Sequence, residues 1–231
     1  MCLGNTLCRY YYIKEFGILK GKFERTIDIN KPYSFSHFCN YFEECMSMLY
    51  KDSYTDIIIV CIGTDRATGD CLGPLIGYKV KDMKYKNVHV YGTLDEPVHA
   101  KNLCEYMELF RKFDNPFIIA IDACLGRFER IGFINIKEGP LSPGSGVNKN
   151  LPAIGHINIT GIVNVGGFME IMILQNTRLS VVMNMANLIA NGLKYNMWKM
   201  NRKAAISNNS LLNRQVASTA NEDTYISYAE E

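Results

Sequence analysis

The sequence has no long apolar segment and almost no excess of charge, and these two absences exclude several classes of protein. A helix needs about 20 consecutive apolar residues to cross a bilayer, and no run in this chain approaches that length. Residues 1–14 also lack the sustained apolar stretch of a signal peptide. The formal net charge is only +2, which gives no electrostatic reason to expect a nucleic-acid partner or an anionic membrane. We therefore expect a soluble protein that binds neither.

Paired cysteine motifs are absent as well. The chain has eight cysteines, but no two of them form a C-x-x-C pair, so their spacing predicts neither a zinc site nor a disulfide framework. Cys61 lies inside an apolar run, where cysteine behaves as a small hydrophobic residue. We therefore expect a reducing compartment, the cytoplasm.

Apolar strands alternate with amphipathic helices along most of the chain. Residues 56–62 and 117–121 are apolar on both faces, which is typical of buried parallel strands. Residues 34–49 repeat apolar side chains at spacings of three and four, the pattern of a helix packed on one side. This alternation predicts a three-layer α/β/α fold with a mostly parallel sheet. The remaining expected elements are strands at 88–91, 131–137 (antiparallel, at an edge) and 156–160, and helices near Pro74 and at 99–113, 168–176 and 178–200.

The same patterns divide the chain into three parts. Residues 1–33 are expected to form an N-terminal extension, in which residues 8–13 can form an edge strand. Residues 34–200 are expected to form the α/β domain. Beyond Asn201 the composition turns polar and the periodicity is lost, which predicts a disordered tail over residues 201–231.

Two acidic residues, Asp70 and Asp122, lie where two strands of such a sheet are predicted to end. In open α/β sheets, ligands bind beyond the carboxyl ends of the strands. A carboxylate directly after the apolar run 117–121 costs free energy unless it is paired, binds a metal or shares a proton. Each aspartate also has a structural interpretation, as a helix cap or a partner of loop amides. Their occurrence at neighbouring strand ends favours a functional site.

Further polar side chains near these strand ends are candidates for the rim of that site. His99 begins a predicted helix, where it can orient a substrate or simply start the helix. His156 lies in a predicted strand, where a histidine is equally well a hydrogen-bonded core residue. The residues expected to contact a substrate are Asp65, Arg66, Thr68, Glu96, His99 and Asn102.

The loop around Asp70 resembles the signature G-(x)4-T-x-D-x-L-G-P of the germination protease that degrades small acid-soluble spore proteins. The matching positions are Gly63, Thr68, Asp70, Leu72, Gly73 and Pro74. Residues 121–123 resemble the second aspartate motif of that family. The sequence is more similar still to spore protease-like sporulation proteins of the YyaC type, over roughly residues 56–195, including the segments 92–100, 155–157 and 161–164. Gly69 stands where the germination protease has proline and the chain is shorter than that enzyme, so substrate recognition and zymogen control do not transfer.

Both groups are similar in fold to hydrogenase maturation peptidases, and the resemblance implies a phosphorylase/hydrolase-like architecture. Three chemistries are compatible with it. In the first, Asp70 and Asp122 form an aspartic-peptidase dyad in which one carboxyl keeps its proton, although the sequence does not say which. In the second, both aspartates and His156 hold a divalent metal ion. In the third, Cys71 or Cys124 is a nucleophile, which the neighbouring carboxylates disfavour because they raise a thiol pKa.

The resulting hypothesis is an endopeptidase-like hydrolase in the cytoplasm of a sporulating cell or spore. Asp70 and Asp122 activate water, and His156 or His99 assists. The substrate is a protein or peptide, with a spore protein as the example that the resemblance suggests. The alternative is a non-catalytic protein that binds a spore protein or peptide in the same cleft, since the two aspartates fit both functions.

Overall fold

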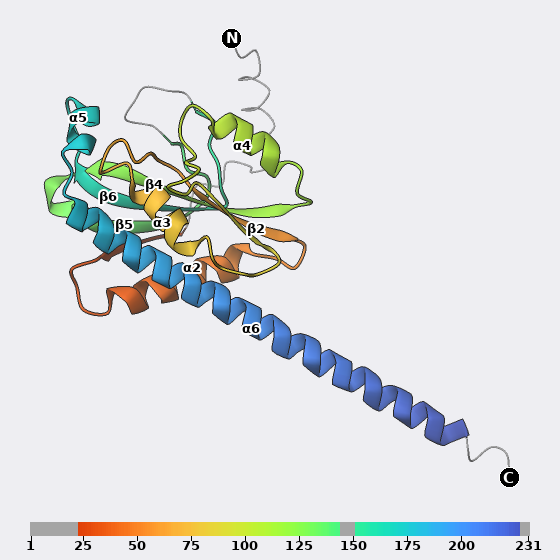
Figure 1. Cartoon of the computed structure of the whole chain (residues 1–231). Helices are drawn as coiled ribbons and strands as arrows, with labels where there is room; N and C mark the ends of the chain where they lie inside the picture. The colour runs from red at the N-terminus through yellow and green to blue at the C-terminus, as the bar shows by residue number, and fades with distance from the viewer. Residues whose placement is uncertain (1–22, 144–150, 227–231) are drawn as a thin grey trace. The chain divides into compact units, whose positions relative to one another are not determined.

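Runs of β-branched residues build the centre of a six-stranded sheet in the computed structural model, which describes residues 23–143 and 151–226 (Figure 1). The strands are ordered β1-β5-β6-β4-β2-β3. Pairings between β2, β3, β4 and β6 are parallel, and β5 runs antiparallel to both of its neighbours. The predicted α/β fold with a mostly parallel sheet is therefore confirmed. The bounds are β1 Glu24–Asp28, β2 Asp56–Cys61, β3 Val88–Tyr91, β4 Pro116–Gly126, β5 Phe133–Glu138 and β6 Ile157–Val165.

One edge of the sheet differs from the prediction. Strand β5 is antiparallel, as expected, but it lies inside the sheet because β1 pairs along its outer side. The edge strand is thus Glu24–Asp28, within the region treated as an N-terminal extension. The strand predicted at residues 8–13 lies outside the described residues.

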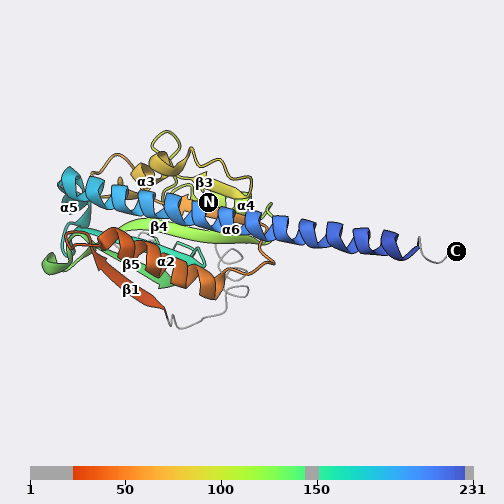
Figure 2. The same cartoon turned by 90° about the horizontal axis from the view of Figure 1, so that it is seen from below.

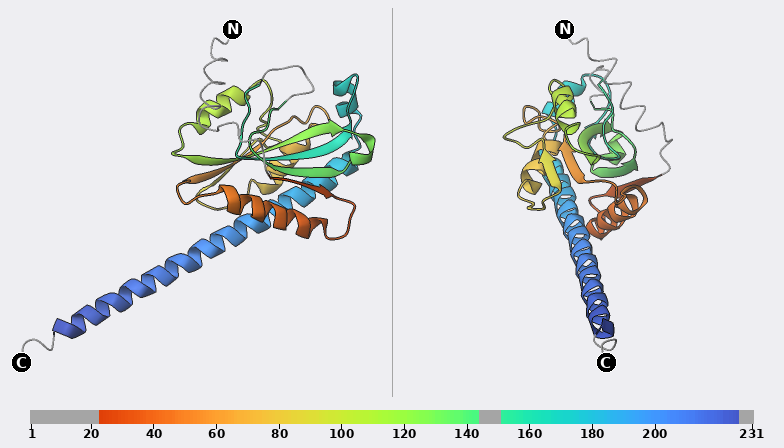
Figure 3. Two further views of the ribbon diagram at one scale, coloured as in Figure 1. Left: turned by 180° about the vertical axis from the view of Figure 1, so that it is seen from behind. Right: turned by 90° about the vertical axis from the view of Figure 1, so that its right-hand side faces the viewer.

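Helices cover the two faces of the sheet unequally. Helices α2 and α3 and the start of α6 lie on one face, and α4 lies on the other (Figures 1, 2 and 3). On the first face, a Cβ added at Gly161 of β6 would meet Leu72 of α3 and Met185 of α6 at 2.4 and 2.8 Å. The helix bounds are α2 Ser34–Leu49, α3 Leu72–Val80, α4 Leu103–Phe110, α5 Glu170–Gln175 and α6 Leu179–Ile226, with the short 3₁₀ helix η1 at Phe128–Arg130.

A separate apolar cluster joins α4 to the centre of the sheet. Leu103, Met107 and Phe110 of α4 are fully buried and pack on the side chains of β2 and β4 that point to their side. The β-branched side chains of those strands supply the opposing surface, as expected for buried parallel strands. The cluster includes both Leu103, the first residue of α4, and Ile62, which follows β2, so the amino end of α4 lies close to the carboxyl end of β2.

The backbone of the C-terminal segment is helical where the sequence predicted a disordered tail. Helix α6 continues past Asn201 to Ile226. The sequence from Leu193 to Glu231 contains no glycine or proline, and a helix that has already formed adds further residues at low cost. The break between the two compact units of the chain falls earlier, between Lys194 and Tyr195. In the part of the chain that the structure describes, no helix is long and apolar enough to cross a membrane.

Candidate functional site

The loop after β2 is folded tightly against the end of its own strand. Gly63 has a φ of +143°, and a Cβ there would lie 2.0 Å from the carbonyl oxygen of Asp70. That carbonyl accepts a hydrogen bond from the backbone N–H of Thr64, at 3.2 Å. At Gly73 an added Cβ would lie 2.0 Å from the carbonyl oxygen of Ile62. Glycine is therefore required at both positions, and the close contacts hold Asp70 beside the carboxyl end of β2.

The far side of this loop is anchored to the segment that follows β6. The backbone N–H of Gly69 donates to the carbonyl oxygen of Leu174 at 2.8 Å, and the hydroxyl of Thr68 donates to the carbonyl of Gln175 at 3.5 Å. A Cβ at Gly69 would lie 2.8 Å from side-chain atoms of Leu174 and Thr177. Proline at this position, as in the germination protease, would remove the N–H donor. The glycine thus belongs to an anchoring contact of this chain.

The sequence predicted that Asp122 ends its strand, but the residue lies in the middle of β4. Pairing with β2 stops at Ile121, whereas pairing with β6 continues as far as Gly126. The apolar run ends at residue 121, but the ladder with β6 still satisfies the backbone beyond it. Asp122 is therefore the first residue of β4 past the end of β2, and it is only 8% exposed. Its Oδ1 accepts a hydrogen bond from the N–H of Ala123 at 2.8 Å.

The two aspartates are electrostatically coupled. Burial raises the pKa of Asp122 well above its usual range, the negative charge of Asp70 raises it further, and the hydrogen bond from Ala123 opposes the shift. Burial also raises the pKa of Asp70, while the N–H of Thr64 and any positive charge on the His99 ring act in the opposite direction. Two neighbouring carboxyls with raised pKa values cannot both ionise readily. Asp122 is the more deeply buried of the two, which favours the neutral form at Asp122 and the charged form at Asp70.

His99 approaches the same site from the loop after β3. The N–H of Gly63 donates to the carbonyl of Val98 at 2.8 Å, so the residue before His99 is tied to the loop that carries Asp70. The side-chain amide of Asn102 accepts from the N–H of His99 at 2.8 Å and donates to the carbonyl of Pro97 at 3.0 Å. Asn102, predicted to bind substrate, therefore uses both ends of its amide to hold the backbone between Pro97 and His99.

His156 is not brought to the aspartates. It precedes β6, and its Nδ1 accepts a hydrogen bond from the N–H of Ile118 at 2.9 Å. Ile118 lies four residues before Asp122 in β4, a distance of about 13 Å along the strand. The ring stacks on Phe117 with 4.7 Å between centroids, and burial lowers its pKa to about 4. His156 thus lies toward the amino ends of these strands, as a hydrogen-bonded residue packed among aromatic rings.

The predicted metal-ligand set is consequently not assembled. Within residues 23–143 and 151–226, no group of three or more histidine, cysteine, aspartate or glutamate side chains is placed to hold a metal ion. Without the imidazole of His156, the carboxylates of Asp70 and Asp122 provide too few protein ligands for the predicted divalent-metal site.

The remaining predicted contact residues lie around the two loops. Asp65, Arg66 and Glu96 are exposed, whereas Thr68 is half-buried and takes part in the anchor to α5. The backbone of Glu96 closes a turn with Thr93, since each N–H bonds an oxygen of the other residue at 3.1 Å. Cysteine chemistry gains no support, because burial is the main cause that raises the pKa of Cys71 and raises that of Cys124 to about 11.

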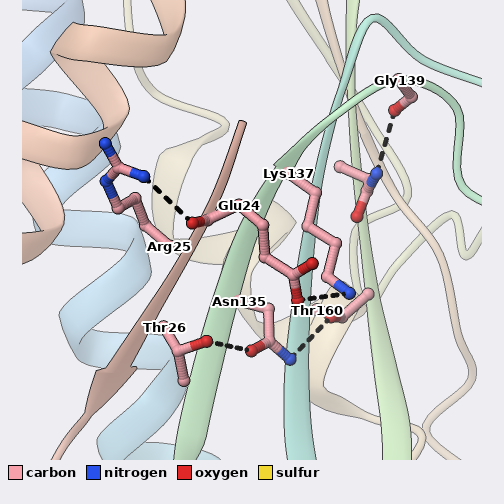
Figure 4. A network of polar contacts seen from close by, with 8 residues as sticks. Glu24, Arg25, Thr26, Asn135, Lys137, Gly139 and Thr160 are labelled. Carbon is pink, nitrogen blue, oxygen red and sulfur yellow. Dashed lines mark hydrogen bonds and ion pairs between the residues drawn. The ribbon is translucent and has the colours of Figure 1, made fainter. Parts of the chain in front are cut away.

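A row of polar side chains leading away from Asp122 was missed by the sequence reasoning. Thr160 of β6 is the register partner of Asp122, and Asn135 and Thr26 follow on β5 and β1. Thr26 donates to Asn135 Oδ1 at 2.9 Å, and Asn135 donates to the Thr160 hydroxyl at 3.5 Å (Figure 4). The polar residues at 158, 160 and 164, at even spacings within β6, were the available signal, because a strand alternates between two faces.

The fold and the site together define an α/β protein with two electrostatically coupled aspartates, Asp70 in the loop after β2 and the buried Asp122 in β4 just past the end of β2. The chain belongs to the family described as "Protein of unknown function (DUF1256)", whose model matches residues 27–192. It is similar to the Bacillus subtilis (strain 168) protein described as "Uncharacterized protein YyaC", with 55% identity over 148 residues, which are 64% of this chain and 72% of that protein. The predicted resemblance to the YyaC type is thus confirmed.

Among solved structures, the chain is similar to the [NiFe] hydrogenase maturation protease HycI from Thermococcus kodakarensis KOD1. The TM-score is 0.41 and the identity 19%, over 66% of this chain and 98% of that one.

Proposed function

We propose that the protein is a peptidase-like hydrolase in which Asp70 and Asp122 act as a general base and a general acid on a peptide bond. The observation that carries this proposal is the almost completely buried carboxyl of Asp122, which lies close enough to Asp70 that the negative charge of Asp70 raises its pKa further. A carboxyl kept neutral and a second carboxyl kept charged at the same place are the two forms that acid–base hydrolysis requires.

The roles follow from the two environments. The Asp70 carboxylate accepts a proton from a water molecule as the water oxygen attacks the carbonyl carbon of the substrate. Asp122 donates its proton to the carbonyl oxygen, which stabilises the tetrahedral intermediate. When the C–N bond breaks, the leaving nitrogen takes the proton held by Asp70, and the new hydroxyl group returns a proton to Asp122. Both carboxyls end in their starting states, and no step passes through a metal ion.

The surroundings of the pair support this division of labour. Asp122 is held by the β4–β6 ladder and by the N–H of Ala123, so its position is fixed before a substrate arrives. Asp70 lies in a loop fastened at Gly63 and Gly69. Such preorganised groups avoid the reorganisation that water would need during the reaction. The resemblance to sporulation proteins makes a spore protein the first substrate to test.

The test is to incubate the purified protein with proteins extracted from sporulating cells and to identify new peptide termini by mass spectrometry. The wild type is compared with Asp70→Asn, Asp122→Asn and, as a matched control, Asp82→Asn, an exposed acid just after α3. We expect new termini with the wild type and the control and none with the two site variants. Termini that persist in both site variants refute the dyad. If no protein produces termini but the same extract protein is captured by the wild type and both site variants, the non-catalytic binding function replaces hydrolysis.

A further inference from the structure

His99 carries an unused polar atom beside the aspartate pair. Among the described residues, its Nδ1 is the one buried side-chain nitrogen or oxygen with no hydrogen-bond partner. A buried polar atom without a partner destabilises the folded state, so a folded protein rarely leaves one without a reason.

Two other histidines show how this chain satisfies a ring nitrogen when the role is structural. His89 Nε2 lies 2.7 Å from Asp56 Oδ1, and His156 Nδ1 accepts the N–H of Ile118. Both rings are held by protein atoms, whereas His99 Nδ1 is left without such an atom.

The backbone of His99 is nevertheless held firmly. The N–H of His99 donates to the side chain of Asn102, and the carbonyl of His99 accepts the N–H of Leu103 at 3.0 Å. On the other side, Val98 forms a parallel bridge with Ile62 and accepts the N–H of Gly63. These contacts place the ring next to the loop of Asp70, close enough that a positive charge on His99 lowers the pKa of Asp70. A side chain on so fixed a backbone, with one free buried nitrogen, is suited to hold a small reacting group.

We propose that His99 Nδ1 and the Asp70 carboxylate together bind the water molecule that attacks the substrate. This inference rests on the proposed function and adds a third catalytic residue to it. The neutral imidazole accepts one hydrogen bond from the water and Asp70 accepts the other, which aims the lone pair of the water oxygen at the carbonyl carbon. During attack, the proton moves to Asp70, the C–O bond forms, and the carbonyl oxygen takes the proton of Asp122. His99 gains and loses no proton, and its contribution is to fix the position of the water.

The test compares His99→Phe and His99→Asn with a matched control, His89→Phe. Phenylalanine removes the free nitrogen, whereas asparagine keeps a polar atom near the position of Nδ1. We expect His99→Phe to lower kcat on the substrate found above about 100-fold, the effect of a misplaced reactant, and His99→Asn to recover most of that loss. Because Nδ1 makes no hydrogen bond to the protein, His99→Phe should fold with an unchanged or higher Tm. His89→Phe should keep kcat but lower Tm, since it removes the contact between His89 and Asp56 and leaves Asp56 only the hydrogen bond from Thr55.

A measurement without substrate separates this inference from the proposed function. In ¹⁵N NMR spectra, His99 Nδ1 of the wild type should be unprotonated, and Asp70→Asn should change its chemical shift. A protonated Nδ1 that donates to a protein atom overturns the inference, and so does a His99→Phe variant with wild-type kcat while both aspartate variants are inactive. If the aspartate variants are themselves active, the proposed function is what fails.

Discussion

Replacement of Asp122 by asparagine should make the protein more stable at neutral pH and should abolish part of its pH dependence. The folded-state pKa of Asp122 is raised by burial and by Asp70, whereas in the unfolded chain it is close to 3.8. Between these two values the folded state binds the extra proton. The stability of the wild type therefore falls as pH rises from about 4, at about 1.4 kcal/mol per pH unit, until the folded pKa is reached.

Asparagine has the shape of the neutral carboxyl and can still accept the N–H of Ala123, but it does not titrate. The Tm of Asp122→Asn should equal that of the wild type near pH 4 and exceed it by about 3–5 °C more for each further pH unit, given the usual enthalpy of a chain of this size. Differential scanning calorimetry from pH 4 to pH 8 measures both curves. A variant that is less stable at pH 7, with a curve parallel to the wild type, would show that Asp122 is a charged structural partner and would refute the assignment of the proton.

Asp56 provides the matched control because its environment has the opposite effect. Partial burial raises its pKa, but hydrogen bonds from Thr55 and His89 and the charge of His89 outweigh burial and lower it. Its contribution to stability is present above the unfolded pKa and is lost as pH falls. Asp56→Asn should therefore lower Tm at pH 7, in the direction opposite to Asp122→Asn.

Two further substitutions test the placement of the loop and of His156. Gly69→Pro removes the N–H that donates to Leu174 and should lower the free energy of unfolding by about 1–3 kcal/mol, seen as a lower midpoint in urea; an unchanged midpoint would contradict the anchor. Burial lowers the pKa of His156 in the folded protein from its ordinary value of 6.5 to about 4, so the wild type should lose about 3 kcal/mol of stability between pH 6.5 and pH 4. His156→Asn, which keeps an acceptor near Ile118, should lack that loss, and an identical acid profile would mean that the ring is not buried in its neutral form.

Local patterns were sufficient for most of the fold. Residues 34–49 carry a helical repeat and residues 56–61 an apolar run, and both form the expected elements. The predictions that failed concern features that depend on partner strands distant in sequence. Strand β4 extends beyond its apolar run because β6 continues to pair with it. Residues Glu24–Asp28 form a strand because they pair with the outer side of β5. Neither partner is visible in the local sequence.

The same distinction separates the predicted site residues that the fold brings together from the one that it does not. Asp70 and His99 follow strands β2 and β3, and Asp122 lies in β4 just past the end of β2. The parallel arrangement therefore gathers all three residues where the carboxyl end of β2 lies. His156 precedes strand β6, which is parallel to β4. It must therefore lie toward the amino ends of these strands, away from the aspartates. Chain order therefore contained the information that excludes His156, whereas Thr160 could be found only from the register between β4 and β6. The raised pKa of Asp122 could not be predicted from the sequence either, because it depends on the burial of Asp122 in the β4–β6 ladder. That burial raises the pKa of Asp122 and so favours the neutral acid that the proposed hydrolysis needs.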